Sequence, residues 1–582
     1  MTNILFTTPE LEHPPKGGPK LRIENSIKAL SRVAELVIAS RVPIQYMGGE
    51  RAVSFYKNYC KRFVFLENSS AEVHAQQLLK LASQENVDVI WLGYGNISYE
   101  ILFYLKKIGC QYPIVIDTDS VWSRFLLRGL PYQPTFENRL EVFVSGWVKR
   151  WEEFWGTQLS NATTAVSNFD AEYYKLFTKR QDAVHVFSNV IDMDNYRDIP
   201  HNPEIKSPCI YLAGTFGPNS PMEEAALWII TEVLPLALLQ IPTLHFYVVG
   251  VGATDKMKAM ANSNVTITGP LESVLPYLGN ANVSVVPLKY ESGTRFKIME
   301  AAACRIPIVS TKLGAEGIPL THGRDILIAD EPEAFSQAIV LLLQNPAYGR
   351  ELADNCFKLI TDICSITAAT KEAETILHAI ADGPKTLALR PDSSMTLVSH
   401  LAYRMNRSTT GLDRVTLALS LFQYLMEQKG SCPLFVEGEE LRHTEELLRE
   451  ALTMAPDHIL LNEAVHICSQ HLHNKVTICA DPAEGKSIVD EAPYKITASE
   501  IKSDPGKYLD RLDSFLCQKQ VPAKIHGVHK MRALCLIALS RLTEAKEALD
   551  QELVQKPDNP ELTLLLRKSC LVIEYEGYAQ QN

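Results

Sequence analysis

The amino-acid sequence predicts an α/β protein with two doubly wound, Rossmann-like domains, followed by an α-helical repeat-like domain. Three observations lead to this fold class. Short apolar runs alternate with helical patterns through about residue 382, as expected for parallel sheets. A turn-rich segment containing Gly383-Pro384 and Arg390-Pro391 follows. Helical periodicity then dominates to residue 582.

The length of 582 residues accommodates about three or four domains. We expect an N-terminal domain at 1–200, a second α/β domain at 201–382, a linker at 383–395 and a helical domain at 396–582. The composition, 46% apolar and 21% charged, is that of an ordinary soluble protein. Its 12 cysteines include no Cys-x-x-Cys pair, which favours free thiols in a reducing compartment.

The formal charge of −11 is unevenly distributed. Residues 1–200 contain 22 basic and 22 acidic side chains, so the acidic excess lies after residue 200. This argues against nucleic acid as a general partner and leaves a membrane-facing N-terminal half open. The chain opens without a signal peptide, and its apolar runs fall short of the ~20 residues that span a bilayer. We expect a cytoplasmic protein, with peripheral contact at the inner membrane face left open.

The N-terminal domain opens with an expected strand at Asn3–Thr8, a Pro- and Gly-rich loop and a helix through Leu30. Gly17 and Gly18 in that loop would permit close backbone approach to a ligand, although such a composition is also typical of a plain turn. Further strands are expected at Leu36–Ala39, Arg62–Leu66, Val87–Leu92 and Pro113–Asp117.

Two carboxylates, Asp117 and Asp119, stand at the carboxyl end of the last of these strands. Ligands of doubly wound sheets gather at such ends, and a strand would direct both side chains to one side. Catalysis by Asp119 and capping of a helix at Val121–Leu127 are both open on this evidence.

The second domain shows the same alternation. A strand from Cys209 carries Gly214, and Asn219 precedes the next helix. Strands at His245–Val249 and Val265–Thr268 follow, the latter ending at Gly269. We expect helices at Leu271–Leu278, Glu333–Gln344 and Ala369–Ile380.

The centre of this domain is residues 283–318. A buried strand at Val283–Pro287 leads through a loop with Gly293 into a helix at Arg295–Cys304, and Ile308–Ser310 forms the next strand. Thr294 is the expected N-cap.

Arg295 and Lys297 occupy the first turn of that helix, where cations oppose the helix dipole unless an anion lies between them. The pattern therefore indicates an anion site, for a diphosphate. Glu300 lies three residues after Lys297 on the same face. The alternative is a solvated helix start where Lys297 and Glu300 form a surface ion pair.

Residues 292–301 (SGTRFKIMEA), 307–311 (PIVST) and 314–317 (GAEG) resemble the nucleotide-sugar-binding segment of retaining family-four glycosyltransferases, which have the GT-B fold. The resemblance covers about residues 1–382. It implies two domains facing a cleft and transfer of a sugar, with retention, from a nucleotide-diphosphate donor to a glycan or lipid-linked acceptor in polysaccharide biosynthesis. No metal or other cofactor is expected if the protein itself neutralises the diphosphate.

The resemblance also implies roles for individual residues. Arg295, Lys297 and the amides of Thr294–Phe296 would stabilise the leaving diphosphate, and Glu300 would accept the ribose hydroxyls. The implied catalytic residues are Arg295, Lys297 and Asp119. The implied donor-binding residues are Gly17, Gly18, Gly214, Asn219, Gly269, Gly293, Thr294, Arg295, Lys297 and Glu300.

The sequence departs from the family pattern at three places. Leu92–Gly95 stands where the acceptor-side histidine is usual, and Ser292 replaces the first glutamate of the paired motif, with Glu291 adjacent. The loop after Gly214 also lacks the usual Arg and Lys, a role we assign to Arg295 and Lys297. These departures support the alternative of a catalytically weak or inactive GT-B scaffold that uses its helical tail for partner binding.

In the last part of the chain, the segments from Glu445 to Pro456 and from Ala533 to Pro557 resemble tetratricopeptide repeats. Cys479–Thr497 interrupts a regular array. The resemblance favours partner docking or self-association through a concave helical face, with a plain helical bundle as the alternative. Four residues at 466–473, His466, Cys468, His471 and His473, lack convincing metal-ligand spacing, and we expect no metal there.

Overall fold

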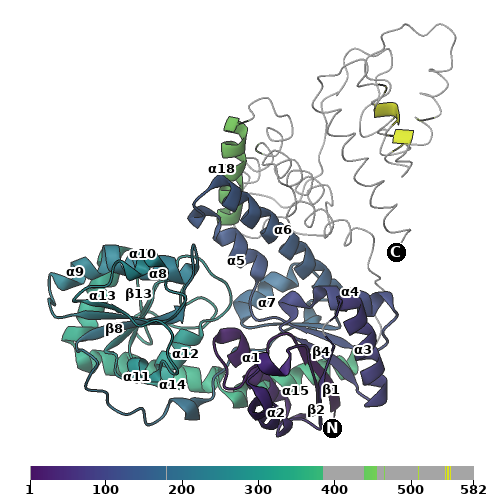
Figure 1. Ribbon diagram of the computed structural model, residues 1–582, viewed down its shortest axis with the longest axis horizontal. Coiled ribbons are helices and arrows are strands. Elements are labelled where there is room, and N and C mark those ends of the chain that lie inside the picture. The colour runs from purple at the N-terminus through teal and green to yellow at the C-terminus, as the bar shows by residue number, and fades with distance from the viewer. Residues whose placement is uncertain are drawn as a thin grey trace. The chain divides into compact units, whose positions relative to one another are not determined.

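The computed structural model describes residues 2–67, 69–178, 180–383 and 438–454, together with the single positions 465, 509, 532, 536, 544, 545, 547–549 and 551. The chain forms two compact units, and the first contains every described residue through Gly383 (Figure 1). The expected linker beyond Gly383, the cluster at 466–473 and the interruption at 479–497 lie outside the described residues.

The first α/β domain is built on a seven-stranded parallel sheet with the order β3-β2-β1-β4-β5-β6-β7. Its strands are β1 (Thr2–Thr8), β2 (Ala34–Ser40), β3 (Arg62–Phe65), β4 (Val89–Gly93), β5 (Ile114–Asp117), β6 (Ala162–Ala165) and β7 (Val184–Val186). Ile4 of β1 lies opposite Leu36 of β2 and Val89 of β4, which fixes the register at the centre of the sheet. The expected parallel, doubly wound arrangement is confirmed.

Helices cover both faces of this sheet, which is why its central strands are continuous apolar runs. The helices are α1 (Gly18–Leu30), α2 (Gly49–Lys57), α3 (Ala71–Gln84), α4 (Tyr99–Lys107), α5 (Trp122–Arg128), α6 (Phe136–Leu159) and α7 (Asn168–Lys175), with single turns η1 (Ile44–Tyr46), η2 (Gly95–Ile97), η3 (Leu130–Tyr132) and η4 (Gln181–Ala183). Side-chain oxygens cap several of them, as Ser70 does for α3 and Thr135 for α6.

The second domain contains a six-stranded parallel sheet with the order β10-β9-β8-β11-β12-β13. Its strands are β8 (Cys209–Thr215), β9 (His245–Val251), β10 (Val265–Ile267), β11 (Val283–Val286), β12 (Ile308–Ser310) and β13 (Leu327–Ile328). Its helices are α8 (Pro221–Trp228), the π-turn η6 (Ile229–Val233), α9 (Leu234–Leu238), α10 (Asp255–Lys258), α11 (Leu275–Leu278), α12 (Phe296–Ala303), α13 (Pro332–Gln344) and α14 (Pro346–Ile363). The turn η5 (Met193–Tyr196) lies in the segment between the two sheets.

The last helix of this unit, α15 (Ile366–Asp382), returns to the first domain (Figure 1). Its Ile366, Ala369 and Ala373 belong to the same buried core as Ile23 and Ile27 of α1. The carboxylate of Glu372 also accepts hydrogen bonds of 2.7 Å from both the amide and the hydroxyl of Ser188. The expectation that the final helices cross back is confirmed.

Several expected helices have different limits in the structure. The helix expected at Leu271–Leu278 is only the short α11, because Pro276 is compatible with a first turn and not with a helix interior. The helix expected at Arg295–Cys304 begins one residue later, at Phe296.

In the second unit the structure describes α18 (Gly438–Met454), which contains Leu448, a buried side chain, and the Glu445–Arg449 ion pair. Most of the segments that resemble tetratricopeptide repeats lie outside the described residues, so the repeat interpretation stays a prediction.

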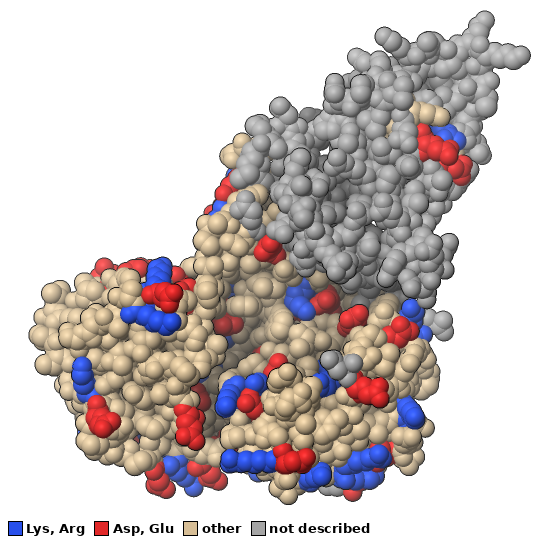
Figure 2. Space-filling view, in the orientation of Figure 1, with Lys and Arg blue, Asp and Glu red and all other residues tan. Residues whose placement is uncertain are grey.

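None of the described helices is long and apolar enough to cross a membrane. The described residues also hold no cluster of His, Cys, Asp and Glu suited to a metal ion. On the face shown in Figure 2, basic and acidic side chains are interspersed rather than gathered in one large patch.

Candidate functional site

The candidate site lies where loops leave the carboxyl ends of parallel strands. Gly214 is the second-last residue of β8, Gly269 follows β10, and the segment from Gly293 to Lys297 follows β11. Because β8 and β11 are neighbours in the sheet, their loops leave the same edge side by side.

The start of α12 differs from the expectation in its cap. Arg295 occupies the N-cap position and no side chain caps the helix. The hydroxyl of Thr294 instead accepts a 3.0 Å hydrogen bond from Nδ2 of Asn189, in the segment that joins the two domains. The prediction of Thr294 as N-cap is therefore wrong, and the amides of the first turn stay available to a ligand.

Lys297 is partly buried, and its ammonium forms no hydrogen bond or ion pair with any residue that the structure describes. The surface pair with Glu300, the alternative left open by the sequence, does not form. Burial lowers the pKa of Lys297, and the charges of Glu291 and Glu300 only partly oppose this. An unpaired cation at the positive end of a helix is a destabilising arrangement that an anion would relieve.

Arg295 is engaged differently from Lys297. Its side chain is 5% exposed, and Nη1 donates to the carbonyl oxygens of Ser292 and Gly293, each at 2.6 Å. Burial lowers the pKa of Arg295, opposed by the charges of Glu291, Glu316 and Asp170. The guanidinium thus braces the loop that precedes α12.

Glu300 lies one turn further along α12 and accepts a 3.0 Å hydrogen bond on Oε1 from the hydroxyl of Tyr196. Burial raises the pKa of Glu300, while Tyr196 and Lys297 lower it. Its second oxygen, Oε2, makes no hydrogen bond within the described part of the chain, so it is left as an acceptor. No motif in the sequence marks Tyr196.

The first domain brings a second helix start to the same place. Gly17 is the N-cap of α1 with φ 90°, a conformation that favours glycine. A Cβ on Gly18 would lie 3.2 Å from the ring of Phe296, the first residue of α12. The structure therefore places the predicted glycine pair against the start of α12 (Figure 1).

The two carboxylates after β5 have different hydrogen-bond partners, and the strand that was expected to carry both ends at the first of them. The strand ends at Asp117, whose buried carboxylate pairs with Arg22 and accepts hydrogen bonds from Thr164 (2.7 Å) and Trp91 (3.1 Å). Asp119 lies beyond the strand and accepts a 3.1 Å hydrogen bond from the indole of Trp122.

Burial raises the pKa of Asp119 to about 6, although Arg22 and Trp122 lower it. The open alternative, that Asp119 caps the following helix, does not hold. The amide of Val121 donates to the hydroxyl of Ser292, and the amide of Ser123 donates to Glu153, each at 3.1 Å. The carboxylate of Asp119 lies at the sheet edge, where Oδ1 also accepts a 3.4 Å hydrogen bond from the hydroxyl of Ser120.

Gly293 is the residue at which the loop before α12 comes closest to the segment of Asp119 and Ser120. Its φ is 79°, and a Cβ there would lie 2.8 Å from Cβ of Ser120 and 2.9 Å from the carbonyl oxygen of Asp119. Any side chain would force the two segments apart, so glycine is required.

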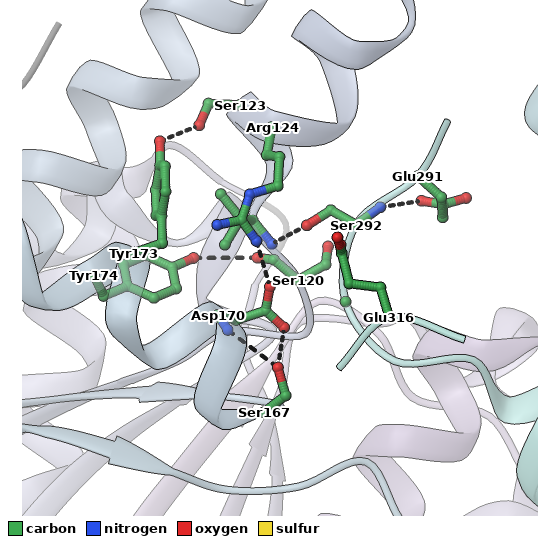
Figure 3. A network of polar contacts seen from close by, with 12 residues as sticks. Ser120, Ser123, Arg124, Ser167, Asp170, Tyr173, Tyr174, Glu291, Ser292 and Glu316 are labelled. Carbon is green, nitrogen blue, oxygen red and sulfur yellow. Dashed lines mark hydrogen bonds and ion pairs between the residues drawn. The ribbon is translucent and has the colours of Figure 1, made fainter. Parts of the chain in front are cut away.

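Around this contact, residues of the first domain form hydrogen bonds to the loop of the second, and Figure 3 shows Ser292 and Glu316 beside Ser120. Arg128 pairs with both carboxylate oxygens of Glu316, at 2.7 and 3.0 Å, and donates to the carbonyl oxygen of Glu291 at 2.9 Å. Ser292, which replaces a family glutamate, uses its hydroxyl to accept from Val121. Ser292 is thus an interdomain contact, a role that its place in the motif did not predict.

The remaining predicted donor-binding residues lie on the same sheet edge without a hydrogen bond to Lys297 or Glu300. Gly214 is packed against Met222, and Gly269 has φ 71° with open space around it. Asn219 is exposed with φ 57°, and its carbonyl oxygen accepts a 2.6 Å hydrogen bond from the hydroxyl of Tyr290.

Two facing Rossmann-like domains with a returning last helix constitute the GT-B fold. Residues 208–345, most of the second domain, match the family model described as glycosyl transferases group 1. The second domain is therefore a glycosyl transferase group 1 domain.

A search among curated proteins finds an uncharacterized 44.6 kDa protein in the cps region of Klebsiella pneumoniae, 24% identical over 162 residues. The match covers 26% of this chain, and the chain spans 41% of that relative's length.

Similar solved structures include Anabaena HepE in complex with UDP and glucose, at 15% identity and a TM-score of 0.48, over 65% of this chain and 100% of HepE. Sucrose-phosphate synthase from Thermosynechococcus elongatus is similar at 16% identity and a TM-score of 0.48, over 66% of this chain and 99% of the synthase.

Proposed function

We propose that the protein transfers a sugar, with retention of anomeric configuration, from a nucleotide-diphosphate donor to a glycan or lipid-linked acceptor. The observation that carries the proposal is the unpaired ammonium of Lys297 at the uncapped start of α12, against which the start of α1 also packs. Two helix N-termini and a free cation at one place form a site for a group with two or more negative charges.

The reaction breaks the bond between the anomeric carbon and the diphosphate, so negative charge builds on the leaving group. Lys297 and the first-turn amides of α12 would stabilise that charge as it develops. Arg295 would act indirectly, because its Nη1 holds the loop carbonyls in place. In this scheme the protein neutralises the diphosphate, and no metal is needed.

The donor's ribose would be recognised by Glu300. One of its oxygens is already held by Tyr196, which fixes the orientation of the carboxylate and leaves the other oxygen for a ribose hydroxyl. Asp119, across the contact at Gly293, would accept a proton on the acceptor side.

A thermal-shift series tests the binding part of the proposal. The intact protein is heated with UDP, GDP, ADP, dTDP and CDP, alongside Glu300→Ala and a control variant on an exposed face, Glu351→Ala. Selective binding raises the melting temperature for one nucleotide, and Glu300→Ala should abolish the rise while the control retains it. No rise with any nucleotide would contradict the proposal.

The alternative to test is a protein that binds the nucleotide without transferring or releasing the sugar. Ser292, in place of the family glutamate, accepts the interdomain hydrogen bond from Val121 and offers a neutral hydroxyl where the family has a carboxylate. Nucleotide binding combined with no release of sugar from any donor would support the scaffold alternative.

A further inference from the structure

One partly buried arginine of the first domain lies across the carboxyl edge of the sheet. Arg41 directly follows β2, and its amide donates to the carbonyl oxygen of Thr8 at the end of β1. Its Nη2 donates to the hydroxyl of Ser98, in the loop after β4, at 2.6 Å. Because β1 lies between β2 and β4, the side chain must span the end of β1, the edge where ligands of doubly wound sheets bind.

Arg41 differs from Arg22, Arg124 and Arg128 of this domain in having no carboxylate partner. Arg22 pairs with Asp117, Arg124 with Asp170, and Arg128 with Glu316. Among the described residues, Arg41 has only the Ser98 hydroxyl as a side-chain partner, and its Nε is buried without an acceptor. Burial alone lowers the pKa of Arg41 to about 10, with no acidic group opposing it.

A partly buried guanidinium with an unpaired, buried Nε and no counter-ion is costly, so the arrangement requires a compensating use. We propose that Arg41 binds an anionic group, a phosphate or a carboxylate, carried by the sugar acceptor. The inference rests on the proposed function and narrows it, because the acceptor would be an acidic or phosphate-linked glycan. A planar guanidinium suits either anion, since it donates two parallel hydrogen bonds to a pair of oxygens.

The loops on both sides of this arginine present apolar groups to solvent. Tyr46, on the loop after β2, is 70% exposed, and Ile97, next to Ser98, is 41% exposed. Exposed apolar side chains beside a buried cation suit an anion attached to a sugar ring or a hydrocarbon chain better than a free ion.

The test uses the full-length protein saturated with the nucleoside diphosphate that raises its melting temperature, so that phosphate-containing probes cannot occupy the donor site. Glucose 1-phosphate, glucuronate, geranyl diphosphate and inorganic phosphate are then titrated by calorimetry. We expect at least one organic probe to bind more tightly than inorganic phosphate. Arg41→Gln should lower the affinity for that probe at least tenfold. Arg41→Lys should lower it by an intermediate factor, because lysine keeps the charge but loses the two parallel N–H donors of the guanidinium.

Arg350→Gln, an exposed arginine on α14, is the matched control and should bind the probe as the wild type does. Binding that is unchanged in Arg41→Gln, or absent for all four probes, would overturn the inference. If Arg41→Gln does not fold, Ser98→Ala serves instead, since it frees the guanidinium from its anchor and should weaken the probe several-fold. An unchanged affinity in that variant would likewise count against the site.

The outcomes separate this inference from the proposed function. A protein that binds a nucleotide but none of the probes overturns the anion site alone. If no nucleotide binds, the proposed function fails. The probes are then titrated without a nucleotide, and the effect of Arg41→Gln on their affinity still tests the anion site. The phosphate and carboxylate arms identify which anion the acceptor carries.

Discussion

Replacing Lys297 by methionine should stabilise the free protein while weakening its ligand. The ammonium has no partner among the described residues, and it lies at the positive end of α12. Removing a cation from a helix N-terminus is worth about 0.3–1 kcal/mol, and the methionine keeps the apolar stem packed. We therefore expect the unfolding free energy of the free protein to rise by about 0.5–1 kcal/mol, or a Tm increase of about 1–3 °C.

The same substitution removes a charge-assisted contact to the diphosphate. Such contacts are worth about 1.5–3 kcal/mol, so nucleoside diphosphate affinity should fall about 10- to 150-fold. Urea unfolding measures the first effect and titration calorimetry the second. Lys358→Met, at an exposed position of α14, is the control and should change neither quantity appreciably. A Lys297→Met protein that is less stable than the wild type, or one with unchanged affinity, would refute the anion site.

Three further predictions concern the residues around this site. The pKa of Asp119 is raised from 3.8 to about 6, so its contribution to stability is present below about pH 4 and is lost as the pH rises through 6. In urea unfolding across pH 4–7, the unfolding free energy of Asp119→Asn should fall less with rising pH than that of the wild type. The same pH dependence in both proteins would argue against the burial of this carboxyl. Tyr196→Phe frees Glu300 from its hydrogen bond and should reduce the preference for a ribonucleotide over its 2′-deoxy analogue several-fold; equal ratios in calorimetry would deny Tyr196 a positioning role. Arg128→Met should lower the unfolding free energy by about 1–3 kcal/mol, and a double-mutant cycle with Glu316→Gln should show coupling above about 0.5 kcal/mol, whereas additivity would mean that the pair is not formed in solution.

The α/β fold could be predicted because its signals are local. Buried parallel strands are short apolar runs, and β12 (Ile308–Ser310) has the limits that its sequence indicated. Helix limits were less certain where proline intervened, as at Pro276 in α11. The helix α6, 24 residues long and rich in Trp and Phe, was not anticipated, although Thr135 caps its start.

Some features of the site could likewise be predicted from the local sequence, whereas others depend on contacts between distant residues. The spacing of Lys297 and Glu300 identified them as candidate site residues. The glycine pair at Gly17 and Gly18 was identified by its position between a strand and a helix. Contacts between residues far apart in the chain could not be foreseen. Asn189 takes the hydroxyl that was expected to cap α12, and Tyr196 holds the carboxylate of Glu300 from over 100 residues away.

The most direct test of the central claim is proton NMR of the purified protein mixed with nucleotide-sugar donors based on the nucleotide that binds. For a retaining transferase we expect slow release of free sugar from one donor, with the first-formed anomer matching that of the donor. Lys297→Met and Glu300→Ala should both abolish this release. Release with the inverted anomer would contradict retention. A protein that binds the nucleotide but leaves every donor intact would contradict the transferase itself.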